Sequence, residues 1–165
     1  MSGIAIYAGT FDPLTFGHLD LIERSAEIFE HLIVAASADT MKQTLFSAEE
    51  RVAMIESVVA GSCYKEKVEV EVFDGLLINY ARSKNIRVII RGLRAYSDFE
   101  YEFQMALTNR KLAPEIETLF MMPKEVHSYV SSSTVKEVAK LGGNTGDFVP
   151  PEIVEALEIK FGKPV

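Results

Sequence analysis

The residues with the most evident chemistry lie near the start of the chain, between Tyr7 and His18, where a short apolar run ends in a glycine-containing turn and leads into a helical pattern. Gly17 and His18 fall in or just before the first turn of that helix. The free N–H groups and the positive dipole end of such a turn favour an anion. His18 adds a side-chain donor, and Thr10 stands where the strand ends. The segment therefore predicts a phosphate site.

Basic and hydroxyl side chains also follow the later predicted strands. Arg91 ends a buried strand and is separated from Arg94 by Gly92 and a leucine, so two guanidinium groups suited to phosphate flank a backbone that a ligand can approach. Lys42 follows the second strand, and Ser131–Ser133 begin a helix, with a lysine one turn further in. Each has a simpler interpretation, because a lone arginine or lysine is often solvated and serines at a helix start are often only a cap.

No covalent catalyst is evident in the sequence, which contains no nucleophile elbow, phosphate-loop motif, zinc-protease motif or paired cysteines. A substrate that brings its own ionised phosphate needs no protein base when it attacks the α-phosphate of a nucleotide and releases pyrophosphate. Positioning and charge stabilisation are then the catalytic devices. In such a step His18 would donate to the α-phosphate, Lys42 and Arg91 would neutralise the attacking phosphate, and Thr10 would orient it.

The order G-T-F-D-P-x-T-x-G-H from Gly9 to His18 resembles the phosphopantetheine adenylyltransferases, a family of the nucleotidyltransferase superfamily whose signature is H-x-G-H. Threonine takes the place of the first histidine here, as it does in that family. Further matches in order and spacing are Lys42, Arg91–Arg94, Asp98–Glu102 and Ser131–Lys136. The chain departs from the family pattern at Ala8, His127 and Val130, and the role of residue 127 is expected to rest on its backbone or on stacking.

The resemblance implies reversible adenylyl transfer from ATP to 4'-phosphopantetheine, giving dephospho-coenzyme A and pyrophosphate. It also implies Mg²⁺ as the companion of ATP, coenzyme A as a feedback ligand, and a homohexamer. By the same resemblance, the pantetheine substrate contacts Thr10, Lys42, Leu77 and Arg91. The ATP site is expected to comprise Thr10, Phe11, His18, Gly92, Leu93, Arg94, Glu102, His127, Ser128, Tyr129, Val130, Ser131, Ser132 and Ser133.

Composition sets the class of protein. A chain of 165 residues with 48% hydrophobic and 25% charged residues is typical of one globular domain, here spanning 1–165. The net charge of -7 argues against nonspecific nucleic-acid binding. The single Cys63 cannot form an internal disulfide, and no apolar stretch is long enough for a membrane helix. We therefore expect a cytoplasmic protein that binds neither nucleic acid nor membrane.

The elements that must position these residues alternate along the chain. Apolar runs predict strands at 4–7, 32–37, 68–72, 88–90 and 118–122, the third of them at an edge because valine alternates with glutamate. Helices are predicted from Leu19, after a capping box at Ser47–Glu50, from Leu76, from Asp98, over Ser131–Lys140 and from Pro151, and 123–129 is expected to be a loop. This alternation indicates an α/β fold with a doubly wound, five-stranded parallel sheet of the Rossmann-like nucleotidyltransferase type.

Ligands of such sheets bind at the carboxyl ends of the strands, so His18 and Arg91 should open onto one edge. Two alternatives remain open at this point. One is a nicotinamide-mononucleotide or cytidylyl transferase of the same superfamily, and the other is a noncatalytic module that only binds a nucleotide.

Overall fold

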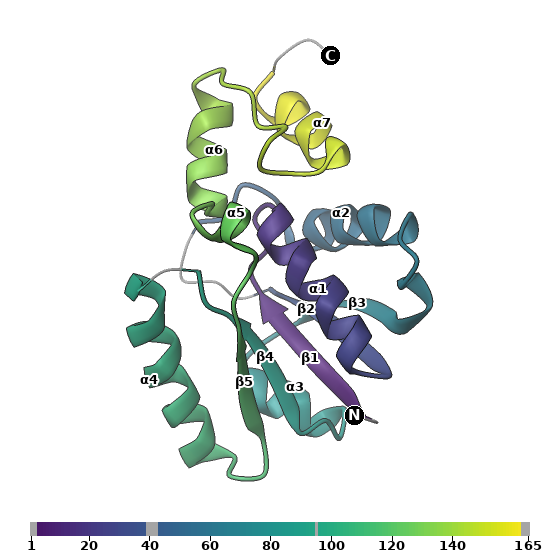
Figure 1. Ribbon diagram of the computed structural model, residues 1–165, viewed down its shortest axis with the longest axis vertical. Coiled ribbons are helices and arrows are strands. Elements are labelled where there is room, and N and C mark those ends of the chain that lie inside the picture. The colour runs from purple at the N-terminus through teal and green to yellow at the C-terminus, as the bar shows by residue number, and fades with distance from the viewer. Residues whose placement is uncertain (1–2, 39–42, 95, 163–165) are drawn as a thin grey trace.

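The computed structural model describes residues 3–38, 43–94 and 96–162, whose strands form a parallel sheet in the order β3-β2-β1-β4-β5 (Figure 1). The chain builds outward from β1 to one edge, returns, and builds β4 and β5 on the other side. This order confirms the doubly wound sheet. The switch point lies between β1 and β4, which is where such sheets open a crevice for a ligand. The strands are β1 Ile4–Gly9, β2 His31–Ser37, β3 Val68–Phe73, β4 Val88–Gly92 and β5 Glu117–Met121.

The central strands are apolar along their length because helices cover both faces of the sheet. On one face, Tyr7 and Val34 pack with α1, α2, α6 and α7 in a single buried cluster. On the other face, Ile6 and Ile33 pack against α3. β3 is an edge strand, as its alternation of valine with glutamate predicts. The helices are α1 Phe16–Ile28, α2 Ala48–Ala60, the 3₁₀ turn η1 Lys65–Lys67, α3 Leu77–Ser83, α4 Tyr96–Leu112, α5 Glu125–Ser128, α6 Ser132–Lys140 and α7 Pro151–Lys160.

Two boundaries and one element differ from the sequence-based expectations. α1 begins at Phe16, since Thr15 caps it, and α4 begins two residues before Asp98. The expected loop at 123–129 contains the short helix α5, which at four residues is too short to show a helical repeat. The predicted capping box at Ser47–Glu50 is confirmed.

Helices α5 and α6 lie beyond the end of the sheet toward which β1 points (Figure 1). They therefore stand over the carboxyl ends of the strands, where the sequence places its candidate phosphate ligands. None of the helices in the described ranges is both long and apolar enough to cross a membrane.

Candidate active site

The carboxyl ends of β1 and β4 lie side by side and bring the two central candidates together. Tyr7 pairs with Ile90 across the two strands, and one step further the Arg91 guanidinium donates to the carbonyl of Ala8 at 2.6 Å. His18 lies in the first turn of α1, directly after β1. The guanidinium groups of Arg91 and Arg94 both act on the charge of His18. The imidazole and the two guanidinium groups thus share one edge of the sheet, as the strand order predicts.

The state of His18 is set by its own helix cap. The backbone N–H of Thr15 donates to Nδ1 at 3.0 Å, so Nδ1 is an acceptor and the ring proton sits on Nε2. Burial, and then Arg94 and Arg91, lower the pKa of His18 to about 3. Phe11 packs edge-on against the ring, with the centroids 5.2 Å apart. His18 is therefore a neutral imidazole with a fixed N–H donor, and it has no free basic nitrogen to remove a proton.

Arg91 is held in place by a carboxylate from the opposite side of the site. Glu102 on α4 accepts from Nε at 2.7 Å and from Nη2 at 2.6 Å, which is the bidentate pairing that suits guanidinium and carboxylate. These bonds and the contact with Ala8 use three of the five guanidinium N–H groups. The other two have no hydrogen-bond partner among the described residues. Glu102, predicted as an ATP residue, thus orients Arg91.

The turn after β4 is fixed by neighbouring strands and loops. The Leu93 N–H donates to Met121 at 2.9 Å, and the Arg94 guanidinium donates to the carbonyl of Val130 at 3.4 Å. A Cβ on Gly92 would come within 2.8 Å of Leu21 on α1. The missing side chain at position 92 therefore permits close packing between β4 and α1.

The segment 127–133 docks onto the start of α1. The His127 ring packs on Phe16 with centroids 5.7 Å apart, and a Cβ on Gly17 would lie 3.4 Å from the His127 carbonyl. Ser132 donates to the carbonyl of Pro13 at 2.8 Å, whereas Ser131 caps α6 by accepting from Thr134. The simpler cap interpretation thus holds for Ser131. The remaining predicted residues here are Ser128, which donates to Glu125, the exposed Tyr129 and Ser133, and the buried Val130.

The residues predicted to contact the pantetheine substrate are less closely grouped. Thr10 is exposed at the end of β1. Leu77 begins α3 after the edge strand β3, which lies two strands from β1 and so about 10 Å away. Lys42 lies outside the described residues.

Sequence reasoning missed two buried ions at this edge. The Asp12 carboxylate is 3% exposed, accepts the N–H groups of Leu45 and Phe46 at 2.9 to 3.1 Å, and pairs with Lys136 at 2.5 Å. Lys136, expected near a triphosphate, is held by this contact. Arg51 is 1% exposed and bonds only to carbonyl groups in the described chain. Asp12 stood inside the recognised motif, but Arg51 follows a helix cap and carried no signal of burial.

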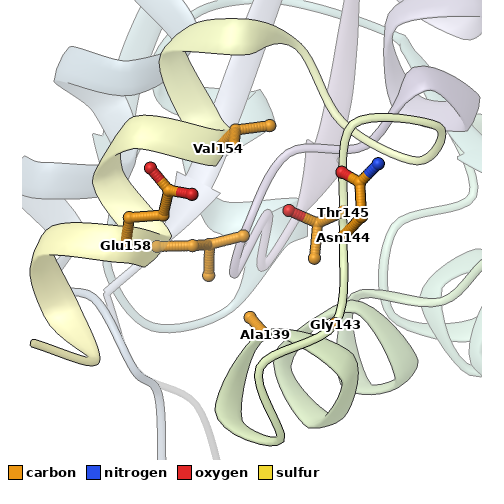
Figure 2. A pocket seen from close by; sticks show the side chains of 7 residues that line it. Ala139, Gly143, Asn144, Thr145, Val154 and Glu158 are labelled. Atoms are coloured by element: carbon orange, nitrogen blue, oxygen red, sulfur yellow. The ribbon is translucent and has the colours of Figure 1, made fainter. Parts of the chain in front are cut away.

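A separate cavity lies between α6 and α7 (Figure 2). Asn144, Thr145 and Glu158 surround it, and its volume of about 30 Å³ suits a water molecule and excludes a nucleotide. None of its lining residues belongs to the predicted site. The candidate active site is therefore the open edge at β1 and β4.

Comparisons with known proteins agree with this geometry. A family model described as cytidylyltransferase-like matches residues 6–138. The phosphopantetheine adenylyltransferase of Geotalea daltonii is 51% identical over 160 residues, covering 97% of this chain and 98% of that protein. The enzyme of the same name from Geobacter metallireducens is 52% identical, covering 98% of this chain and 97% of that protein.

Solved structures share the fold at low identity. The nicotinic acid mononucleotide adenylyltransferase of Plasmodium falciparum, complexed with NaAD, superposes with a TM-score of 0.71 at 15% identity, covering 98% of this chain and 97% of that one. A nicotinate-nucleotide adenylyltransferase structure from Vibrio parahaemolyticus superposes with a TM-score of 0.66 at 17% identity, covering 96% of this chain and 93% of that one. The likeness of these structures shows the fold, whereas the close relatives and the matching family model show the family. The chain belongs to the phosphopantetheine adenylyltransferases, within the cytidylyltransferase-like group.

Proposed function

We propose that this chain transfers the adenylyl group of ATP reversibly to 4'-phosphopantetheine, giving dephospho-coenzyme A and pyrophosphate in coenzyme A biosynthesis. The observation that carries the proposal is identity of about half the residues, over nearly the full length, to proteins named for this reaction. The geometry supports it, because one neutral donor and two guanidinium groups meet at the switch point of the sheet.

The reaction is proposed to be a direct in-line displacement. An oxygen of the 4'-phosphopantetheine phosphate attacks the α-phosphorus of ATP, the bond to the bridging oxygen breaks, and pyrophosphate leaves with its electron pair. The attacking phosphate is already ionised, so no base is needed. The state of His18 supports this, since its Nδ1 lone pair is occupied by Thr15 and its Nε2 carries a proton. Catalysis is then positioning plus stabilisation of charge.

Each predicted catalytic residue has a proposed part in that step. His18 donates from Nε2 to the α-phosphate, where negative charge spreads as the bond breaks. Arg91, held by Glu102, presents its remaining N–H groups to the attacking phosphate. Thr10 orients that phosphate from the end of β1, Lys42 adds a positive charge, and Leu77 contacts the pantetheine chain.

ATP is proposed to lie along the start of α1, the turn after β4 and the segment above them. In the first turn of α1 the N–H of Phe16 donates to the Phe148 carbonyl and that of His18 to the Thr15 hydroxyl, so the anion is proposed to meet the N–H of Gly17 and the positive dipole end of the helix. Arg94, in the turn after β4, donates to the carbonyl of Val130 and is proposed to reach the triphosphate. The ATP residues are the predicted set, namely Thr10, Phe11, His18, Gly92, Leu93, Arg94, Glu102 and residues 127–133.

Mg²⁺ is proposed to arrive with ATP. Within the described residues no three His, Cys, Asp or Glu side chains are grouped to hold a metal ion, and the nearby carboxylates of Asp12 and Glu102 are paired with cations. Phosphate oxygens and water would therefore be its main ligands. When bound, it would offset the negative charge of the triphosphate, and the proposed step needs no protein ligand to the metal.

Coenzyme A is the proposed feedback ligand, since it contains the dephospho-coenzyme A skeleton of the product and would occupy the same subsites. The proposed assembly is a homohexamer, which the exposed apolar side chains of α4 support. Phe99 and Phe103 stack there with centroids 5.5 Å apart and remain 48% and 44% exposed. The proposed location is the cytoplasm, where a lone thiol stays reduced.

Pyrophosphate release tests the function. The protein is mixed with ATP, Mg²⁺ and 4'-phosphopantetheine, and with a panel of nucleotides and acceptors that includes nicotinamide mononucleotide and CTP. Rapid release with ATP and 4'-phosphopantetheine is expected. Faster turnover with another pair would replace the proposal with a sister transferase, and tight ATP binding without turnover on any acceptor would indicate a nucleotide-binding module.

A further inference from the structure

Arg51 is the largest fully buried side chain in the described chain, with 1% of its surface exposed. It lies in the first turns of α2, after the Ser47 cap. Its Nε donates to the carbonyls of Phe46 and Ser47, both at 3.2 Å. Its Nη1 donates to Thr10 at 2.6 Å and to Ser37 at 2.9 Å. A buried cation is costly, and here carbonyl oxygens replace its water.

The carbonyls that Arg51 binds come from three segments at one edge of the sheet. Thr10 follows β1, Ser37 ends β2, and Phe46 precedes α2. The parallel pairing of β1 with β2 places the first two side by side, and the guanidinium bonds to both. Arg51 therefore ties the ends of two neighbouring strands at the edge that carries the candidate site.

Asp12 holds the same turn from its other side. Its carboxylate accepts the N–H of Phe46 at 3.0 Å, and Arg51 donates to the carbonyl of the same residue. The peptide groups on the two sides of Phe46 are thus hydrogen-bonded to a buried carboxylate and a buried guanidinium group. Arg51 binds the Thr10 carbonyl directly, and Asp12, two residues further along, is itself held by Phe46 and Lys136.

We propose that Arg51 is a positioning residue for adenylyl transfer, holding the Thr10 backbone so that the exposed Thr10 side chain meets the attacking phosphate. The proposal rests on the proposed function, which assigns Thr10 to that phosphate. Arg51 makes no contact with substrate itself and acts through the carbonyl of Thr10.

The test compares Arg51→Lys and Arg51→Met with Ile55→Ala, a control one turn further along α2 that is likewise fully buried. Pyrophosphate release gives kcat and both KM values, calorimetry gives the Kd for ATP, and thermal melting gives stability. Arg51→Met is expected to lower kcat about 100-fold, as a misplacement of about 1 Å does. Arg51→Lys should recover part of that loss, because it keeps the positive charge but can donate to fewer carbonyls. ATP affinity should be nearly unchanged, and Ile55→Ala should melt earlier with nearly normal kcat.

A kcat in the folded Arg51 variants no lower than in Ile55→Ala overturns the proposal, as does a parallel loss of ATP binding. If Arg51→Met does not fold, Arg51→Lys decides alone. Combining Arg51→Lys with Thr10→Ala should add little to the effect of Thr10→Ala, and fully multiplicative losses contradict action through Thr10. A wild-type protein without transfer activity overturns the proposed function as well, whereas an active one with unaffected variants overturns only this inference.

Discussion

At the scale of single residues, His18 illustrates how a backbone contact decides what a side chain can do. The Thr15 N–H occupies Nδ1, and burial, together with Arg94 and Arg91, lowers the pKa and keeps the ring neutral. An imidazole in this state is a hydrogen-bond donor without being an acid of useful strength. Its expected contribution is therefore one strong bond to a phosphate oxygen that gains charge in the transition state.

Replacing His18 by alanine removes that donor. We expect kcat to fall by about 100- to 1,000-fold, roughly 3 to 4 kcal/mol, because an oxyanion donor contributes mainly in the transition state. The KM values should change much less. The matched control is His31→Ala. His31 begins β2, so it lies at the amino end of the strands, away from the candidate site, and this variant should keep normal rates. A large rise in KM with unchanged kcat would instead assign His18 to ground-state binding.

The lowered pKa of His18 also predicts how stability depends on pH. The folded pKa is about 3, below the usual histidine value of 6.5, so between these values the unfolded chain binds more protons than the folded one. Folding stability attributable to His18 is therefore complete above about pH 6.5 and declines as the pH falls toward 3, by at most about 1.4 kcal/mol per pH unit.

Thermal melting of the wild type and His18→Asn between pH 4 and pH 7 measures this dependence. The variant should lose less stability on acidification, since asparagine does not titrate. Parallel curves for the two proteins would show that His18 is protonated as readily in the folded state as in the unfolded chain.

At the scale of elements, helix α6 is joined to the first motif by two contacts. Ser132 donates to Pro13, and Lys136 pairs with the buried Asp12. These contacts hold the segment 127–133 over the start of α1. Helix α6, which carries predicted ATP residues, is thus positioned by the loop after β1, which carries Thr10 and Phe11.

Lys136→Met tests the second contact. The Lys136 side chain is 26% exposed, so its loss should lower the free energy of unfolding by about 1 to 2 kcal/mol, between the values of exposed and buried pairs. The KM for ATP should rise, because α6 loses an anchor. Lys140→Met, one turn along on the same helix and exposed, is the control. Equal effects of the two substitutions on melting and on KM would contradict the proposed anchor.

The strands and most helices could be predicted because their signals are local. Apolar runs, valine alternation and the Ser47 cap each depend on neighbours in sequence. The start of α1 was placed too late, since its cap uses His18 where a glutamate or glutamine is usual. The burial of Arg51 depends on carbonyls 4 to 41 positions away, which no local pattern reveals.

At the scale of the whole molecule, helix α4 connects the site with a large exposed surface. Its residue Glu102 holds Arg91, while apolar residues on either side of it in the sequence remain exposed. They include Phe99, Tyr101, Phe103, Met105 and Leu107. Apolar side chains left exposed together on one helix favour an interface there. The proposed hexamer would cover it and would steady α4.

Phe103→Asp places a charge within this surface and tests both consequences. If α4 forms the interface, sedimentation should show a smaller assembly, because a buried unpaired carboxylate is costly. The kcat should fall too, since Glu102 would hold Arg91 less firmly in a mobile helix. Ile159→Asp, at an exposed apolar position on α7, should leave both unchanged. An assembly that stays intact in Phe103→Asp would place the interface elsewhere, and a smaller assembly with full activity would show that α4 needs no neighbour to position Arg91.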